Sequence, residues 1–277
     1  MESVPEEGAV RPQTLMLTLA GEYLLGRGVA VSAASVLEVL ARAGVSEHAA
    51  RSTLTRMVNR GLLARQRHGR SMYFGLTERT DRILRDGERR LWRIGAVDRD
   101  WNGLWTLLAF SLPEAWQRQR HELRAQLAWA GFAPLFNGLW IASGQPETGE
   151  IVAGLGLDAH VKVFHASAVP GTEVGEMIRE TWDLPAIAAR HRAFLERWRP
   201  AEAEPGADPL ALKLLLDSDW LQVLRGDPRL PLAHLPADWP ALESEALFTR
   251  VGDLAAPGAA RLAEELLDVR PVESLRS

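Results

Sequence analysis

The chain has 277 residues, 47% of them hydrophobic, and its 32 lysines and arginines against 36 acids give a formal charge of −4. Zero cysteines exclude disulfides, thiol catalysis and cysteine-bound zinc or iron–sulfur clusters. No apolar run approaches the roughly 18 residues of a membrane span. The start, "MESVPEEGAVRPQ", is acidic where a signal peptide needs a basic flank. We therefore expect a cytoplasmic protein of two or three globular domains, with no membrane partner.

Positive charge is confined to one part of the chain. Residues 11–93 contain 15 arginines, no lysine and 7 acids, so this segment carries eight positive charges and the remainder twelve negative ones. Such an asymmetry indicates a polyanionic partner for the basic segment alone. Arginine suits phosphate because its planar fork binds two oxygens, although a genome-wide preference for arginine explains the scarcity of lysine equally well. The inference of a polyanionic partner therefore rests on the clustering of positive charge and not on the use of arginine instead of lysine.

The basic segment begins with two predicted helices separated by a short strand. "PQTLMLTLAGEYLL" has apolar side chains at helical spacing, and Pro12 suits a first helical turn. "GVAVS" is short and β-branched. A second helix follows it, with Ser32 or Ser35 as its N-cap and with Gly44 where a helix end favours a left-handed residue.

Ser46 is the predicted N-cap of a third helix, which forms a helix-turn-helix with the second. At about 100° per residue, the apolar side chains of this third helix fall on one side, centred on Leu54. Short hydrogen-bonding side chains occupy the opposite side, and a DNA major groove admits such a face. We predict that this face reads base edges through His48, Ser52, Thr55 and Arg56.

Arg51 lies closer to the buried side of the third helix. We include it among the predicted DNA-binding residues as a phosphate contact. A structural ion pair with Glu47 fits the same position equally well.

A basic hairpin follows the third helix. Gly61 ends the helix, and two short strands, "LLARQR" and "SMYFGLT", flank a turn at Gly69. Arg67, His68 and Arg70 stand at the tip, where they are predicted to contact the DNA backbone or minor groove. Three helices followed by a hairpin is the order of a winged helix.

Winged helices also serve as protein-docking modules, and this alternative stays open. Arginines on both the helix and the hairpin favour nucleic acid. Duplex DNA is the expected target, because the segment offers no aromatic platform for unpaired bases.

A connecting helix, expected over residues 81–100, leads into a segment of different composition. All ten tryptophans lie from Trp92 onward. Residues 101–170 alternate strand-like and helical runs in the order βαββαβ, with Asn137-Gly138 as a hairpin signal. This order predicts a ferredoxin-like domain. "RPAEAEPGADP" at 199–209 is expected to be a loop.

No catalytic or metal-binding motif stands out. The histidines are scattered, and no H-E-x-x-H, G-x-S-x-G or Walker loop is present. His160 and His165 are five residues apart, a spacing that aligns them on neither a strand face nor a helix face. We therefore expect no enzyme activity, no cofactor and no metal.

The sequence resembles the PaaX family of bacterial transcriptional repressors over nearly its whole length. The final matching segment is the most specific, because Asp-Pro, Leu-Pro and Asp-Trp-Pro groups recur in it at distinctive spacing. The matching segments are "RPQTLMLTLAGEYL", "GVSEHAARSTLTRMVNRGLLARQRHGRSMYFGLT", "WNGLWTLLAFSLPE", "LRAQLAWAGFAPLFNGLWIA" and "LRGDPRLPLAHLPADWPALESEALF".

The resemblance implies an α+β multidomain fold. An N-terminal winged helix-turn-helix domain at 11–80 would precede the ferredoxin-like central domain, and a mostly helical C-terminal domain would occupy 171–277. It also implies a homodimer that binds double-stranded operator DNA until an acyl-CoA such as phenylacetyl-CoA releases it. The resemblance does not name the effector-binding residues; Arg179, Arg190 and Arg192 are candidates for the CoA phosphates.

The family's middle domain resembles a small metal-dependent nuclease of CRISPR adaptation, which raises an enzymatic alternative. Such nucleases hold their metal with a carboxylate at the end of the first strand. Here "AFSLPE" places Ser111 at that position. A serine in place of the carboxylate leaves Mg²⁺ without an obvious anchor.

Overall fold

The computed structural model describes residues 11–89, 95–203, 206 and 208–272. These residues form two compact units, each assembled from separate stretches of chain. Of the described residues, the first unit contains 11–89, 196–203, 206, 208–221 and 246–272, and the second contains 95–195 and 222–245. Much of the connecting segment expected at 81–100 lies outside the described residues. The boundaries of the four consecutive segments expected from the sequence stay predictions.

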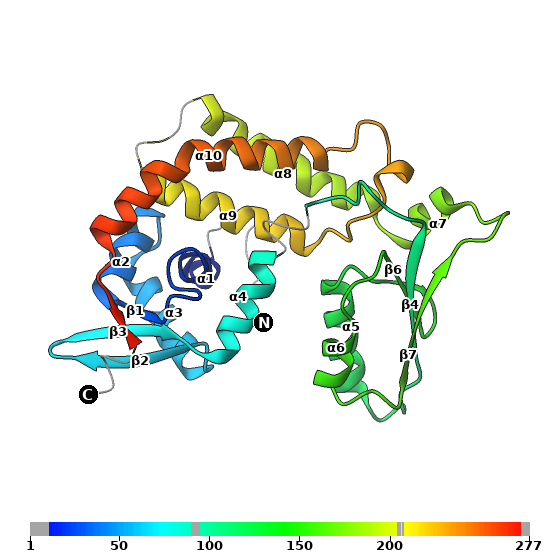
Figure 1. The fold of residues 1–277 in the computed structure, drawn as a ribbon, viewed down its shortest axis with the longest axis horizontal. Coiled ribbons are helices and arrows are strands. Elements are labelled where there is room, and N and C mark those ends of the chain that lie inside the picture. The colour runs from blue at the N-terminus through cyan, green and yellow to red at the C-terminus, as the bar shows by residue number, and fades with distance from the viewer. Residues whose placement is uncertain (1–10, 90–94, 204–205, 207, 273–277) are drawn as a thin grey trace. The chain divides into compact units, whose positions relative to one another are not determined.

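The part of the first unit at residues 11–89 follows the order of elements that the sequence predicts (Figure 1). Helix α4 begins at Glu78, three residues before the expected connecting helix. The elements are α1 (Pro12–Tyr23), β1 (Val29–Ser32), α2 (Ala33–Arg42), α3 (Glu47–Asn59), β2 (Leu63–His68), β3 (Ser71–Leu76) and α4 (Glu78–Arg89).

Local signals fix the ends of these helices. The Oγ of Ser32 accepts a hydrogen bond from the amide of Ser35 at 3.1 Å, so Ser32 is the cap of α2. The Oγ of Ser46 likewise accepts from the amide of Ala49 at 3.3 Å and caps α3. Gly44, between the two helices, has φ +82°, a value that costs a residue with a side chain considerable strain.

Helices α1, α2 and α3 share one apolar core, in which α1 is buried on most of its sides and α3 on one. Leu15 and Leu19 from α1, Leu40 from α2, and Leu54 and Met57 from α3 are all at most 4% exposed. Burying a side chain of this size contributes roughly 1.5–3 kcal/mol relative to leaving it in water. The core therefore holds α3 by one side and leaves its opposite side free.

The sheet of the first unit contains a strand that the sequence analysis did not predict. Its order is β2-β3-β1-β8, and β8 (Val269–Pro271) comes from the C-terminal end of the chain, the red arrow in Figure 1. Strand β8 pairs antiparallel with β1, placing Arg270 opposite Ala30. The segment assigned to a separate C-terminal domain thus completes the N-terminal sheet.

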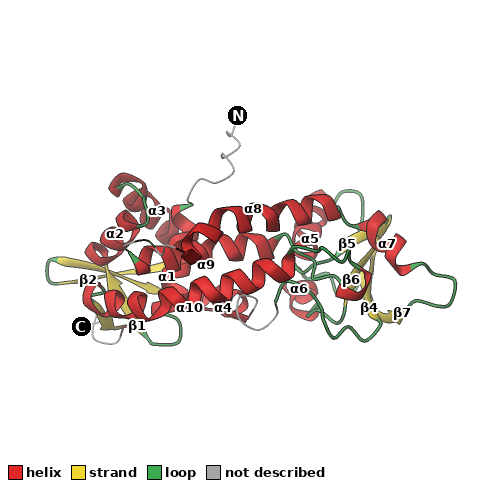
Figure 2. Ribbon diagram, turned by 90° about the horizontal axis from the view of Figure 1, so that it is seen from above, coloured by secondary structure: helices red, strands yellow, loops and turns green. Residues whose placement is uncertain are grey.

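After residue 180 the described chain contains three long helices, α8 (Leu184–Ala203), α9 (Pro209–Arg225) and α10 (Ala241–Leu266), with a short 3-10 helix, η2 (Leu232–His234), before the last of them (Figure 2). Helix α8 continues through Pro200, so the loop expected at 199–209 is wrong in its first part. Trp198 explains the continuation: it is 5% exposed, and its indole donates a hydrogen bond to Asp219 of α9 at 3.1 Å. This anchor offsets the hydrogen bond that the proline cannot donate.

The second unit contains an antiparallel sheet of order β5-β6-β4-β7, with α5 and α6 on one side (Figure 1). Gly138, at φ +78°, makes the predicted turn between β5 and β6. The part of the chain that the structure describes is therefore mixed α/β, with two small antiparallel sheets. The elements are β4 (Leu104–Phe110), α5 (Gln117–Trp129), β5 (Ala133–Phe136), β6 (Leu139–Ser143), α6 (Gly149–Gly154), β7 (Val161–Ser167) and α7 (Val174–Thr181).

The helix-covered side of this sheet forms the core of the second unit. Leu108 of β4 and Trp140 of β6 pack there against Leu123 and Leu127 of α5, which are fully buried. Opposite residues of neighbouring antiparallel strands share a face, so their neighbours along each strand point to the other side. Among the described residues, no helix combines the length and apolarity needed to cross a membrane.

Candidate nucleic-acid interface

The side of α3 that faces away from the core carries the predicted base-reading residues. His48, Thr55 and Arg56 are exposed, and Ser52 is half-buried. Thr53 is only 1% exposed, and it widens the buried stripe predicted from the apolar residues alone. The exposed face therefore consists of short polar groups and arginine, which is the chemistry that a major groove accepts.

Two arginines of α3 have partners within the helix. Arg51 contacts Glu47 at 2.7 Å, so the ion pair that the sequence left open as an alternative is present. Both side chains are more than 60% exposed, at 62% and 68%, so water and salt weaken the pair. Arg56 donates to the Oγ1 of Thr53 at 3.0 Å, which directs its guanidinium along the helix surface.

The turn between α3 and the hairpin is fixed by side-chain hydrogen bonds. Gly61 has φ +66°, and the amide of Leu62 donates to the carbonyl of Met57 at 2.8 Å, closing the end of the helix. The hydroxyl of Thr77, beyond β3, donates to the carbonyl of Gly61 at 2.8 Å. The hairpin thus leaves the helix at a defined angle.

Strand register places the hairpin side chains on two different faces. Arg65 pairs with Phe74 and Arg67 with Met72, and Phe74 belongs to the core that also contains α3. Arg65 and Arg67 therefore lie on the helix-facing side of the sheet. The Nε of Arg67 donates to the carbonyl of Gly69 at 3.1 Å, which holds the side chain near the tip. Arg70 is exposed in the turn.

His68 lies on the opposite face of the hairpin and has a partner from the C-terminal strand. Its Nε2 is 3.2 Å from Nη1 of Arg270. Arg270 also donates from Nε to the hydroxyl of Tyr73 at 3.0 Å, and this hydroxyl donates to Asp268 at 2.7 Å. The structure thus groups His68 with the C-terminal strand, whereas Arg65 and Arg67 share the face of the helix.

Sequence reasoning left several exposed arginines near this surface out of the predicted site. Arg60 ends α3, and Arg79 donates to its carbonyl at 3.3 Å. The alternation of side chains along a strand could have identified Arg65, because it is two residues from Arg67 and therefore lies on the same face. For Arg270 there was no local signal, because its neighbours come from a remote part of the sequence. Arg60, Arg65 and Arg79 widen the positive surface that a phosphate backbone would meet. Arg270 instead lies with His68 on the opposite face of the hairpin.

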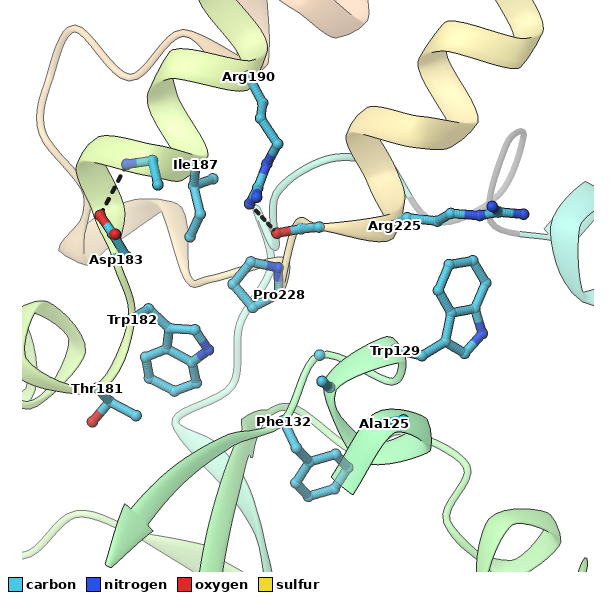
Figure 3. A pocket seen from close by; sticks show the side chains of 14 residues that line it. Ala125, Trp129, Phe132, Thr181, Trp182, Asp183, Ile187, Arg190, Arg225 and Pro228 are labelled. Carbon is cyan, nitrogen blue, oxygen red and sulfur yellow. Dashed lines mark hydrogen bonds between the residues drawn. The ribbon is translucent and has the colours of Figure 1, made fainter. Parts of the chain in front are cut away.

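No group of three histidine, aspartate or glutamate side chains comes together as a metal site anywhere in the part of the chain that the structure describes. Ser111 follows the last residue of β4, and its amide donates to the carbonyl of His160 at 3.1 Å. Of the candidate effector arginines, Arg179 and Arg192 are exposed, and Arg190 lines a pocket of the second unit (Figure 3).

Comparison with models of known protein families finds matches along most of the chain. Three family models match in chain order: "PaaX-like protein" over residues 11–80, "PaaX protein central Cas2-like domain" over 98–178, and "PaaX-like protein C-terminal domain" over 182–265.

The chain belongs to the PaaX family. A curated relative, "Transcriptional repressor PaaX" of Escherichia coli (strain K12), is 26% identical over 279 residues, which cover 96% of this chain and 85% of the relative. Among solved structures, "Uncharacterized protein Rv0674 from Mycobacterium tuberculosis" aligns with a TM-score of 0.59 at 21% identity, covering 89% of this chain and 96% of the other. At that identity the second comparison supports the fold alone.

Proposed function

We propose that this PaaX-family chain is a cytoplasmic transcriptional repressor that binds double-stranded operator DNA through a winged-helix module at residues 11–80. In this proposal α3 is the recognition helix in the major groove, and the β2–β3 hairpin is the wing. His48, Ser52, Thr55 and Arg56 would face base edges. Arg51, Arg67, His68 and Arg70 would lie beside the phosphate backbone.

One observation carries the proposal: α3 exposes a hydrogen-bonding face, and an arginine-rich hairpin follows it at once. The core fixes α3 by its apolar side, and Thr77 fixes the turn at Gly61. A docking module for another protein would more commonly present aromatic or aliphatic anchors at this place. In the described part of α3 the exposed side chains are polar or charged instead.

The proposal includes a homodimer formed through the central domain. The βαββαβ order of this domain and its strand order β5-β6-β4-β7 support the ferredoxin-like fold that we propose for it. Part of the sheet face without α5 and α6 is apolar and open. Phe136 is 70% exposed and pairs with Leu139, and Phe164 is 55% exposed and pairs with Leu107. An uncovered apolar face of this kind marks an interaction surface, and two winged helices on a partly symmetric operator require a dimer.

Release of the operator by an acyl-CoA, such as phenylacetyl-CoA, completes the proposal. It rests on membership of the family, whose relative in Escherichia coli carries the name of a repressor. A ligand releases DNA only if it binds the released form more tightly, and by reciprocity operator DNA then weakens ligand binding by the same factor.

The decisive experiment is a gel-shift titration of the full-length protein against duplex DNA from the region around its own coding sequence. Arg56→Ala should weaken binding to a mapped site by about 1–3 kcal/mol and relax the sequence preference at one base position. Arg124→Ala is the matched control, because Arg124 is also exposed but lies on α5 of the second unit. An unchanged affinity and sequence preference for Arg56→Ala would exclude the recognition face.

The same titration tests the enzymatic alternative. Incubation of the labelled duplex, single-stranded DNA and RNA with the protein and Mg²⁺ should leave every strand intact. Metal-dependent cleavage by the wild-type protein would favour a nucleic-acid-processing enzyme instead, with binding as a step of its reaction.

A further inference from the structure

Two hydrogen bonds inside α3 determine what its exposed face can donate and accept. The hydroxyl of Thr55 donates to the carbonyl of Arg51, four residues earlier, at 3.0 Å. The guanidinium of Arg56 donates from Nη2 to the Oγ1 of Thr53, also at 3.0 Å. Both bonds form within the helix, so they are present before any partner binds.

Arg56 presents only hydrogen-bond donors, and it is held at one point. A guanidinium has no acceptor, and it carries further N–H groups besides the one that bonds Thr53. Arg56 is exposed, whereas Thr53 is 1% exposed and lies on the buried side of the helix. A long side chain is thus directed by a residue that the core itself fixes. Ordering of this kind before binding lowers the entropy cost of the contact.

One base edge in the major groove matches a fixed group of donors. Guanine shows two neighbouring acceptors there, O6 and N7, whereas adenine shows one acceptor beside an amino donor. Thymine shows one acceptor beside a methyl group, and cytosine shows an amino donor. A planar guanidinium can therefore make two parallel bonds to guanine, and it can make at most one to each of the other bases.

Thr55 presents the opposite chemistry next to Arg56. A hydroxyl has one proton, and in Thr55 this proton is given to the carbonyl of Arg51. The outward lone pairs of Oγ1 can then only accept. In the major groove, the groups that can donate to them are the amino groups of adenine, at N6, and of cytosine, at N4.

We propose that Arg56 binds O6 and N7 of a guanine, that Thr53 positions Arg56 for this contact, and that Thr55 accepts from the amino group of a nearby adenine or cytosine. Thr53 is buried and touches no base itself. The proposal rests on the operator-binding function proposed above, and it adds the bases that are read and the origin of the preference. Because Thr55 and Arg56 are adjacent in the chain, the two bases lie close together in the operator.

The test begins with a duplex that the full-length wild-type protein selects from a randomised pool. Fluorescence anisotropy then compares this duplex with versions that carry one altered base. 7-Deazaguanine, which lacks N7, should weaken binding about tenfold or more at one guanine, because it removes a hydrogen bond to a charged group. Inosine at the same position is the matched control: it lacks only the amino group in the minor groove, so binding should be nearly unchanged.

Variants of Arg56 and Thr53 test the two roles separately. Arg56→Lys keeps the charge and loses the planar fork, so it should retain affinity for unrelated duplexes and no longer distinguish guanine from 7-deazaguanine. Thr53→Val removes the Oγ1 acceptor from a side chain of nearly the same shape. It should weaken binding to the selected duplex by roughly two- to tenfold and reduce the preference for guanine.

A structural role of Thr53 alone would not give this pattern. Thr53→Ser keeps the hydroxyl and should restore wild-type binding. Thr18→Val is the matched control in the same unit, because Thr18 is 6% exposed and its hydroxyl donates to the carbonyl of Thr14 within α1. It should leave affinity and base preference unchanged. Circular dichroism of each variant reports whether the fold is intact.

The acceptor role of Thr55 is tested by deleting the amino group that it meets. Purine in place of adenine, or pyrimidin-2-one in place of cytosine, should weaken wild-type binding about fivefold, the range of one neutral hydrogen bond. Thr55→Val should be insensitive to that deletion, whereas Thr55→Ser should respond like the wild type. Comparison of all four combinations of protein and base isolates the contact between them.

The results separate this inference from the operator-binding function itself. Equal sensitivity of the wild type and Arg56→Lys to 7-deazaguanine would overturn the guanine contact. A folded Thr53→Val protein with wild-type affinity and preference would overturn the positioning role. Selection of a clear sequence that none of the altered bases affects would remove the inference alone, whereas a wild-type protein that selects no sequence would remove the operator-binding function and the inference together.

Discussion

Arg270 of the C-terminal strand donates a hydrogen bond from Nη1 to Nε2 of His68 in the hairpin, at 3.2 Å. A guanidinium has no acceptor, so Nε2 of His68 must carry the lone pair in this contact. Arg270 also lies over the ring of Tyr73, with its Cζ 5.7 Å from the ring centre. Strand β8 is thereby tied to the proposed wing near its tip, at His68, and further along β3, at Tyr73.

Removal of the Arg270 side chain should loosen the hairpin. Arg270→Ala deletes the bonds to His68 and Tyr73, and we expect faster amide hydrogen exchange in β2 and β3 and a several-fold weaker affinity for operator DNA, because a hydrogen bond of this type contributes about 1 kcal/mol. Hydrogen exchange by mass spectrometry and gel shift measure the two effects. Arg261→Ala, an exposed change on α10, should alter neither. Unchanged exchange in the hairpin would show that β8 does not support the wing.

The exposed tip of the hairpin should contribute affinity without sequence preference. Arg67→Ala and Arg70→Ala each remove one predicted phosphate contact. The affinity for the operator and the affinity for unrelated duplexes should therefore fall by similar factors. The slope of log K against log salt should become shallower by about 0.9 for each phosphate that the protein no longer neutralises. Fluorescence anisotropy over a salt series measures that slope. A weaker affinity for one sequence alone would instead place the arginine on a base edge.

The elements from α1 to α4 were predictable because their signals are local. Ser32, Ser46, Gly44 and Gly61 mark helix ends through groups that lie within a few residues of one another. The face of α3 followed from its periodicity, and the ion pair of Arg51 was one of two alternatives that the sequence already offered. Features that depend on interactions between residues close together in the sequence are thus well predicted from the sequence.

Neither strand β8 nor the pocket could be predicted, because both depend on contacts between residues that are far apart in the sequence. "VRP" is too short to show an alternating pattern, and Pro271 argues against a strand unless that strand lies at the edge of a sheet. Its partner, β1, is more than two hundred positions away. The pocket that Arg190 lines likewise unites side chains from three remote segments.

The open face of the central sheet should hold the proposed dimer together. Phe164→Glu places a charge on a side chain that is already 55% exposed, so the fold should survive while an apolar interface does not. We expect the dimer dissociation constant to rise more than about tenfold, as read by light scattering over a concentration series. Val169→Glu is the control, because Val169 is 69% exposed in the loop after β7. A dimer unaffected by Phe164→Glu would place the interface elsewhere.

A buried group of charges should make the stability of the first unit depend on pH. Lys213 of α9 donates to Asp217, one turn further along, and lies 3.5 Å from Glu22 of α1. Burial raises the pKa of Asp217 to about 7, although the ammonium of Lys213 acts in the opposite direction and Glu22 adds to the rise. One oxygen of Asp217 has no hydrogen-bond partner, which agrees with a carboxyl that holds a proton readily.

Because the pKa of Asp217 is higher in the folded protein than its ordinary value of 3.8, the folded state binds a proton that the unfolded state releases. This contribution to stability is complete below pH 3.8 and is lost as pH rises through about 7. Each unit of pKa difference is worth about 1.4 kcal/mol. Urea unfolding between pH 5 and 8, followed by circular dichroism, should therefore show a free energy of unfolding that falls with pH. Asp217→Asn, which stays neutral, should flatten that fall, and Asp253→Asn on the exposed side of α10 should reproduce the wild-type slope. A slope that Asp217→Asn leaves unchanged would mean that Lys213 keeps Asp217 ionised across this range.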